Sequence, residues 1–166
     1  MEVRSVETVI EALNKARVEY LIVGGLAVNA YGYERLTGDI DLVIGLEPDN
    51  IIRGLRALLD IGYQMAVPVS PEEFANPELR ETWRKEKNML VLRMWSEVHR
   101  RTPIDVFVYE PFDFAREVEA AQWIELRADL KAPIVSYKTL IAMKEQSERN
   151  KDKLDVESLR KLDPFR

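Results

Sequence analysis

Apolar positions follow two different periods along the chain, and these predict an ordered series of helices and strands. Spacings of three to four residues predict helices at 5–17 (capped by Ser5), 26–32, from Pro48 to about 61, 111–121, 136–147 and 150–162. Short apolar runs predict strands at 19–23, 38–44, 63–67, 88–95 and 104–109, with short edge strands at 123–127 and 132–135. Residues 68–87 are rich in proline and charge, and we expect a loop and a surface helix there.

The order of these elements predicts a mixed β-sheet flanked by helices, an α/β or α+β fold. The length of 166 residues suits one domain, residues 1–166, in which 136–166 form a short C-terminal helical extension. Apolar residues make up 46% and charged residues 32% of the chain, the balance of an ordinary globular protein.

Composition narrows the chemistry that the chain can perform. The absence of cysteine excludes disulfides and thiolate chemistry, and a single histidine, His99, excludes a multi-histidine metal site. The net charge of −5 argues against binding nucleic acid by bulk electrostatics. No apolar run reaches the length of a membrane span and the N-terminus lacks a signal-peptide pattern, so we expect a cytoplasmic protein without membrane contact.

Two aspartates interrupt the apolar strand predicted at 38–44. Alternate side chains of a strand point to the same face, so Asp39 and Asp41 share a face, with backbones roughly 7 Å apart. Burying like charges is unfavourable unless a positive charge compensates them, and the strand contains no lysine or arginine. The pattern favours a bound divalent cation, whereas one aspartate alone would more simply cap a turn or face solvent.

A third acid and a glycine pair complete the pattern. Asp105 alternates with apolar residues in the strand at 104–109, and three carboxylates converge if that strand lies beside the first. Oxygen-rich sites suit Mg²⁺ or Mn²⁺, which also coordinate phosphates. Gly24-Gly25 lies where a strand turns into a helix, and backbone N–H groups there can approach a phosphate. The glycines alone indicate only a tight turn, but with the three acids they indicate metal-dependent nucleotide chemistry.

This pattern resembles the nucleotidyltransferase superfamily typified by DNA polymerase beta, which carries Gly-Gly or Gly-Ser, then Asp-x-Asp or Asp-x-Glu, then an acid on a neighbouring strand. Residues 34–42 (Glu-Arg-Leu-Thr-Gly-Asp-Ile-Asp-Leu) resemble the Arg-x-Thr-x-Asp-Ile-Asp-Leu stretch of abortive-infection (AbiEii-like) toxins and related minimal nucleotidyltransferases. Residues 144–155 resemble the Lys, Arg, Lys-Asp and Asp block of that family. The resemblance covers most of residues 20–160, although its specific motifs occupy few positions.

The resemblance implies metal-dependent transfer of a nucleoside monophosphate from an NTP to an acceptor hydroxyl on RNA, protein or a small molecule. Carried over by position, Asp39 and Asp41 would hold the metals, Mg²⁺ or Mn²⁺. Asp105 would help to bind the second metal and act as the base, and Asp152 would order the C-terminal part of the site. The residues implied in nucleotide contact are Gly24, Gly25, Arg35, Thr37 and Lys144.

Three departures from the family pattern leave alternatives open. One is the long gap between Asp41 and Asp105, filled by the charged segment 68–87. The second glycine replaces a more common serine, which removes one hydroxyl contact to phosphate, and the short C-terminal region leaves little room for a separate acceptor-binding domain. One alternative is a degenerate member that binds a nucleotide or a partner protein without catalysis, against which the three acids argue. Another is the toxin of a toxin–antitoxin pair acting on tRNA, with an antitoxin or second subunit as partner; the acidic net charge argues against a large RNA acceptor.

Simpler structural roles are open for the side chains around the acids. Arg35 can pair with Glu34 or Asp60, and Thr37 can cap the entry to the strand. Lys144 is either a solvated helix residue or one that points inward with its apolar neighbours.

The remaining distinctive residues have mainly structural interpretations. His99, beside Arg100 and Arg101, is expected in a solvated turn, and the functional alternative is a small basic lip beside the site. The tryptophans are expected in the core or at an interface rather than as base-stacking platforms: Trp83, Trp95 and Trp123.

Overall fold

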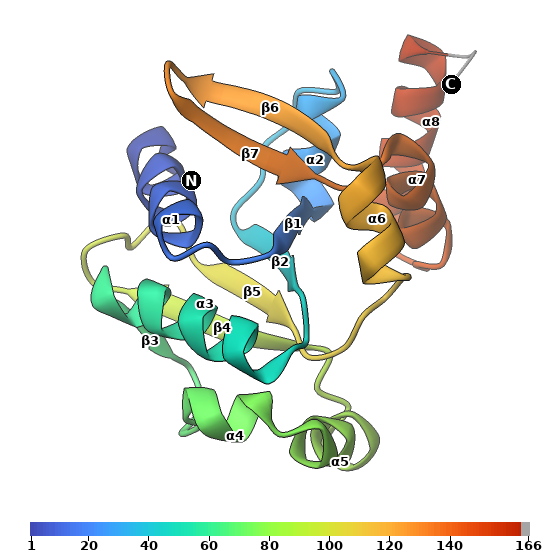
Figure 1. Ribbon diagram of the computed structural model, residues 1–166. Helices are drawn as coiled ribbons and strands as arrows, with labels where there is room; N and C mark the ends of the chain where they lie inside the picture. The colour runs from blue at the N-terminus through green and yellow to red at the C-terminus, as the bar shows by residue number, and fades with distance from the viewer. Residues whose placement is uncertain (164–166) are drawn as a thin grey trace.

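The computed structural model describes residues 1–163, whose seven strands form one mixed sheet in the order β3-β4-β5-β2-β1-β7-β6 (Figure 1). β1 pairs with β7, and β2 with β5, in parallel, and the other neighbours are antiparallel. The predicted mixed α/β sheet is confirmed; residues 164–166 of the expected C-terminal extension lie outside the described residues. The strands are β1 Tyr20–Val23, β2 Ile40–Ile44, β3 Tyr63–Met65, β4 Val91–Ser96, β5 Ile104–Phe107, β6 Gln122–Arg127 and β7 Leu130–Ile134.

Helices flank the sheet, as the sequence predicts. α1 packs on α3 and β7, and α7 contacts both α2 and α8 (Figure 1). Within residues 1–163, no helix has the length and apolar character needed to cross a bilayer. The helices are α1 Val3–Lys15, α2 Gly24–Ala30, α3 Pro48–Asp60, α4 Pro71–Ala75, α5 Pro77–Lys87, α6 Phe114–Ala120, α7 Tyr137–Glu145 and α8 Asn150–Leu162.

Alternation in β2 separates a core face from a polar face. Ile40, Leu42 and Ile44 are fully buried, and Ile44 comes close to Gly54 of α3, where a Cβ would lie 3.4 Å from its Cδ1. Asp41 points to the opposite face. The side chain of Asn50 fixes the far end of this strand, because it accepts from the N–H of Glu19 and donates to the carbonyl of Gly45. One face of β2 is therefore wholly apolar and buried, while the other carries Asp41 beside the buried Val43.

His99 is buried, so the expectation of a solvated turn was wrong. Its Nδ1 lies 2.9 Å from Oγ of Ser5, and its ring stacks on Tyr63 with centroids 5.4 Å apart. Ser5 lies inside α1 rather than at its N-cap, which is Glu2. The burial of this Ser5–His99 pair takes both residues out of the roles predicted for them.

Residues 68–87 form two helices, α4 and α5, instead of a loop and one surface helix. α4 begins with a capping box between Ser70 and Glu73. Phe74 and Trp83 are buried with ring centroids 6.2 Å apart, and Arg80 donates to the Phe74 carbonyl at 2.5 Å. The segment is thus anchored by its own small apolar contact. Trp83 fits the core expectation, whereas Trp95 and Trp123 are 40% and 61% exposed.

Candidate active site

The three aspartates predicted from the sequence lie together on the polar face of β2 and β5. Asp41 stands directly opposite Asp105 in the parallel register, and Asp39 lies just before the first residue of β2. Each carboxylate offers an oxygen, and these oxygens lie within 4.8 Å of one another. We call these three residues the acid cluster. The sheet register, rather than sequence proximity, brings Asp105 to the other two.

The glycine pair makes room for the acid cluster. Gly24 adopts φ of +66°, and a Cβ there would lie 1.9 Å from Oδ2 of Asp41, so no other residue fits without moving the carboxylate. The N–H of Gly25 hydrogen-bonds to the Asp41 carboxylate. A Cβ on Gly25 would lie 2.3 Å from Oγ1 of Thr37, so the serine that is more common in the resembled family would clash with Thr37. Both glycines are therefore required by side chains of the site itself.

Two acids of the cluster, Asp41 and Asp105, have raised pKa values, and burial is the largest cause for both. Burial raises the pKa of Asp41, and the carboxylates of Asp39 and Asp105 raise it further, to about 6, although Lys144 and the N–H of Gly25 oppose the shift. Burial also raises the pKa of Asp105, against the opposing effect of Arg93. Since a raised carboxyl pKa means that the charged form is disfavoured, the cluster has a deficit of positive charge.

Arg93 of β4 is a member of the site that sequence reasoning missed. It stands opposite Asp105 in the antiparallel register, with Nε 3.3 Å from Oδ1 of Asp105 and Nη2 3.3 Å from Oδ2 of Asp39. The side chain of Arg93 is 50% exposed, so solvent weakens its attraction to the two carboxylates. A lone arginine inside an apolar strand was the available signal, just as the lone aspartate drew attention to Asp105.

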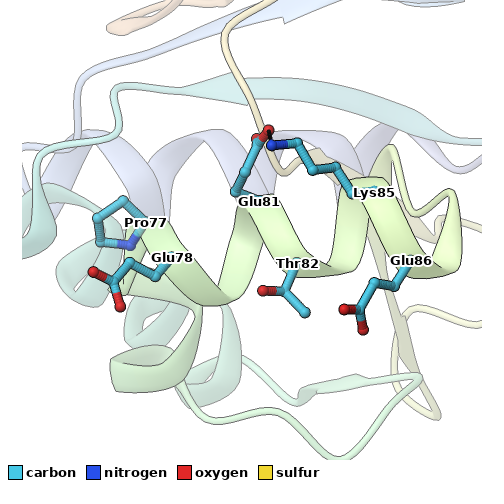
Figure 2. Close-up of a pocket in the computed structure, with 6 residues that line it drawn as sticks. All are labelled: Pro77, Glu78, Glu81, Thr82, Lys85 and Glu86. Atoms are coloured by element: carbon cyan, nitrogen blue, oxygen red, sulfur yellow. Dashed lines mark ion pairs between the residues drawn. The ribbon is translucent and has the colours of Figure 1, made fainter.

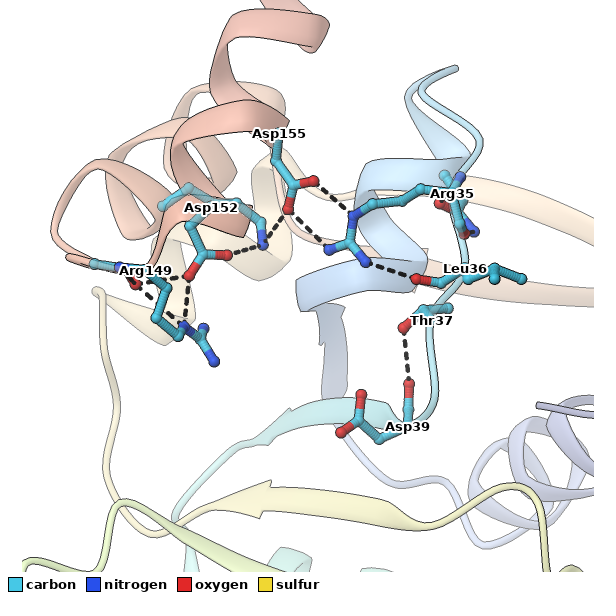
Figure 3. A network of polar contacts seen from close by, with 10 residues as sticks. Arg35, Leu36, Thr37, Asp39, Arg149, Asp152 and Asp155 are labelled. Carbon is cyan, nitrogen blue, oxygen red and sulfur yellow. Dashed lines mark hydrogen bonds and ion pairs between the residues drawn. The ribbon is translucent and has the colours of Figure 1, made fainter.

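A network of ion pairs joins the C-terminal helices to the segment that leads into β2, and all of its members except the exposed Arg149 are largely buried. Nζ of Lys144 lies 2.6 Å from Oδ1 of Asp152 and 2.8 Å from Oδ2 of Asp155. Arg35 binds Asp155 through two nitrogens, at 2.6 and 2.8 Å, which Figure 3 shows across the gap between α8 and this segment. Arg149 completes it with a contact of 2.7 Å to Asp152. We call these five residues the C-terminal ion network.

This network decides among the roles considered for its members. Arg35 pairs with Asp155, and not with Glu34 or Asp60 as the structural alternative supposed. Lys144 is buried rather than solvated. Burial alone would raise the pKa of Asp152, but hydrogen bonds from Lys144, Ser147 and Arg149 lower it to about 2. Asp155, only 1% exposed in its side chain, holds the network together, although in the sequence it stands only as the last acid of the resembled block, with no predicted role of its own.

A cleft of about 590 Å³ lies between the acid cluster and the C-terminal helices. Its floor includes Gly24, Asp41 and Asp105. One wall comes from α7, α8 and the turn between them, and the other from β4, β5 and the residues after β5. The residues of these walls are Leu140, Met143, Lys144, Gln146, Ser147, Arg149 and Asp152 on the first, and Leu90, Val91, Phe107, Tyr109 and Pro111 on the second.

A second hollow, shown in Figure 2, has a different character. Its lining comes from a single helix, α5, between Pro77 and Glu86. Glu81 and Lys85 form an ion pair of 3.1 Å along it, of the kind that exposed helices carry. No residue of the acid cluster lines it, so the cleft above Asp41 and Asp105 is the candidate active site.

The donor atoms of the acid cluster suit a divalent cation such as Mg²⁺ or Mn²⁺. All three ligands are carboxylates, the oxygen donors that these ions prefer. Oδ1 of Asp105 is buried and accepts no hydrogen bond from residues 1–163; its close cation is Arg93. Three carboxylates, one of them with this buried oxygen, fit a metal ion better than they fit the single, half-exposed arginine.

The sheet with its paired acidic strands has the fold of the nucleotidyltransferase superfamily, and two solved structures share it. The lincosamide antibiotic adenylyltransferase LnuA, crystallised with lincomycin, matches with a TM-score of 0.60 and 14% identity over 95% of each chain. An antigenic nucleotidyltransferase-like protein from Paracoccidioides brasiliensis matches with a TM-score of 0.55 and 16% identity, over 97% of this chain and 76% of that one. No protein-family model and no curated protein sequence matches the chain. At these identities the likeness establishes the fold.

Proposed function

We propose that the protein transfers a nucleoside monophosphate from an NTP to an acceptor hydroxyl, with Mg²⁺ or Mn²⁺ bound at the acid cluster. The observation that carries this proposal is the convergence of three carboxylates within 4.8 Å in a nucleotidyltransferase fold, two of which, Asp41 and Asp105, line the floor of a cleft. A bound divalent cation would neutralise phosphate charge and favour deprotonation of the attacking hydroxyl. Asp39, Asp41 and Asp105 are the residues that would hold it.

The chain's own residues have separate tasks in this reaction. The acceptor oxygen forms a bond to the α-phosphorus while the bond from that phosphorus to the bridging oxygen breaks, and pyrophosphate leaves. The hydroxyl proton passes to Asp105, whose carboxylate lines the floor of the cleft. Asp105 lies beside Asp41 in the register, so the base and the metal ligands share one short stretch of sheet.

The triphosphate is assigned to the side of the cleft where Gly24 and Lys144 lie. Gly24 gives the backbone a close approach to the cluster, and Lys144 brings a positive charge to the adjoining wall from α7. The Thr37 hydroxyl lies next to Gly25. In the proposed complex it donates to phosphate in place of the serine hydroxyl that is more common at the Gly25 position. Arg35 acts through Asp155 to hold Thr37 in place.

We further propose that residues 136–166 belong to the catalytic unit and do not form a separate module. The cleft has one wall from α7 and α8 and its floor from β1, β2 and β5. The site is therefore incomplete without the C-terminal helices, which supports one domain over residues 1–166.

The test is label transfer from each α-³²P-labelled common NTP, with Mg²⁺ or Mn²⁺, to pools of small metabolites, total RNA and protein. Small molecules belong in the test because LnuA is an antibiotic adenylyltransferase, and the RNA pool tests the tRNA-directed toxin alternative. Asp41→Asn and Asp105→Asn should lower transfer by roughly 100-fold or more. Asp129→Asn is the matched control, since Asp129 is an exposed turn residue at φ of 67°, a conformation that asparagine tolerates. Equal transfer by wild type and Asp41→Asn in every pool would overturn the proposal.

A further inference from the structure

The wall of the cleft beyond Asp105 is apolar. Asp105 and Phe107 share one face of β5, and Tyr109 continues that alternation after the strand ends. On the adjacent strand, Val91 stands opposite Phe107. Leu90 precedes it and remains 47% exposed. We call this surface the apolar wall: Leu90, Val91, Phe107, Tyr109 and Pro111.

The aromatic part of the apolar wall is braced from behind. The rings of Phe107 and Tyr109 have centroids 5.8 Å apart and are tilted by 54°. The guanidinium of Arg84, from α5, lies over the Tyr109 ring with Cζ 4.2 Å from the centroid, a cation–π contact. One face of Tyr109 is thereby occupied, and the ring is held where it lines the cleft. Aromatic side chains that are fixed yet partly exposed beside a reactive centre suit a ligand rather than the core.

The direction of attack assigns this wall to one of the two substrates. Displacement at phosphorus places the attacking and leaving oxygens roughly in line, on opposite sides of the α-phosphorus. If pyrophosphate leaves toward Gly24 and Lys144, the hydroxyl enters from the far side of the cluster. The sheet order β1-β2-β5-β4 puts β5 and β4 on that far side. There the apolar wall begins at Phe107, which is two residues after Asp105 and lies on the same face of β5.

We propose that the apolar wall is the acceptor subsite and that the acceptor is a small molecule with an apolar or aromatic body and a hydroxyl that reaches Asp105. This inference rests on the proposed function and specifies its second substrate. None of the five side chains of the wall is charged, and the two nearby arginines are already engaged, Arg84 with the Tyr109 ring and Arg93 with the acid cluster. The wall therefore offers no free cation for the phosphates of an RNA acceptor. The opposite wall, by contrast, carries Lys144 and Arg149, which suit the triphosphate.

The inference is tested by ligand-observed NMR on the whole protein with Mg²⁺ and a non-hydrolysable NTP analogue. The probes are aromatic and alicyclic alcohols, compared with polyols of similar size and with a short oligoribonucleotide. We expect saturation transfer to the aromatic and alicyclic alcohols. Their binding should be at least about tenfold tighter than that of the polyols. Val91→Thr, which conserves shape and adds a polar group, and Tyr109→Ala should each weaken alcohol binding by about tenfold. Trp123→Ala, at an exposed aromatic of β6 outside the cleft, should leave it unchanged.

Calorimetry with the NTP analogue tests the proposed function separately from the acceptor assignment. Wild type and both wall variants should bind the analogue with the same affinity, within about twofold. If wild type fails to bind the analogue, the proposed function fails. If it binds the analogue but prefers polyols or RNA, or if Val91→Thr and Tyr109→Ala bind the alcohols like wild type, only the acceptor assignment is wrong. Because Val91→Thr keeps a β-branched residue in β4, a folding defect in Tyr109→Ala leaves the test intact.

Discussion

The acid cluster and the C-terminal ion network are both built on aspartates, yet their charges are balanced in opposite ways. The cluster sets three carboxylates against one half-exposed arginine, and the pKa of Asp41 rises to about 6. The network sets two carboxylates against Arg35, Lys144 and Arg149, and the pKa of Asp152 falls to about 2. A satisfied network holds the fold, whereas an unsatisfied cluster is poised for a ligand. The charge balance around each aspartate therefore distinguishes structural from reactive acids here.

Breaking the network should have the largest effect on stability. Asp155→Ala leaves Arg35 and Lys144 buried without their shared partner, and losses of this type amount to about 3–5 kcal/mol. Urea unfolding followed by circular dichroism measures the loss. Glu145→Ala is the control, because Glu145 pairs with Arg160 on the surface and its removal should change stability by less than about 1 kcal/mol. Similar losses in both variants would mean that the network is not the stabilising unit.

The acid cluster should respond in the opposite direction. A carboxyl whose folded pKa is raised from 3.8 to about 6 destabilises the fold progressively as pH rises between those values. In metal-free buffer, Asp41→Asn should therefore stabilise the protein at pH 7.5, by at most about 3 kcal/mol, and have little effect near pH 4. Thermal unfolding across this pH range measures the difference. A destabilised Asp41→Asn protein at pH 7.5 in metal-free buffer would contradict the crowding of the cluster.

Gly25 and Thr37 lie between the two regions and test how tightly they are joined. Gly25→Ser should destabilise the protein by about 1–3 kcal/mol, because the new Cβ falls 2.3 Å from Oγ1 of Thr37. Adding Thr37→Gly removes that obstacle, so the double variant should melt at a higher temperature than Gly25→Ser alone. If Thr37→Gly lowers the melting temperature of Gly25→Ser by as much as it lowers that of wild type, the two residues do not interact as described.

The smallest expected effect concerns the compensation within the cluster. Arg93→Gln removes the cation that a metal must displace, so Mn²⁺ should bind severalfold more tightly, a change of about 1 kcal/mol. Electron paramagnetic resonance of free Mn²⁺ measures the affinity, and the difference should shrink in high salt. Arg100→Gln, at an exposed pair with Glu97, should leave the affinity unchanged. Weaker Mn²⁺ binding by Arg93→Gln would show that the arginine supports the metal instead of replacing it.

The sequence predicts the local features of this molecule better than its long-range partners. Alternation in the apolar runs was enough to place Asp41 and Asp105 on strands, and an aspartate there is conspicuous because it opposes burial. The partners of Arg35 and His99 were missed because nothing in the local pattern identifies Asp155 or Ser5. Burial of a polar residue depends on what another segment offers it, and that information lies far away in the chain.

The Arg35–Asp155 pair also fixes when the site can form. Its members are 120 residues apart, so the segment entering β2 gains this partner only after the helix near the other end of the chain has docked. Contacts of such sequence separation require the closure of a long loop, which costs entropy and slows folding. A nascent chain whose α8 is still inside the ribosome already carries all three acids, but the segment before them lacks its anchor. That anchor forms only once α8 has emerged and docked.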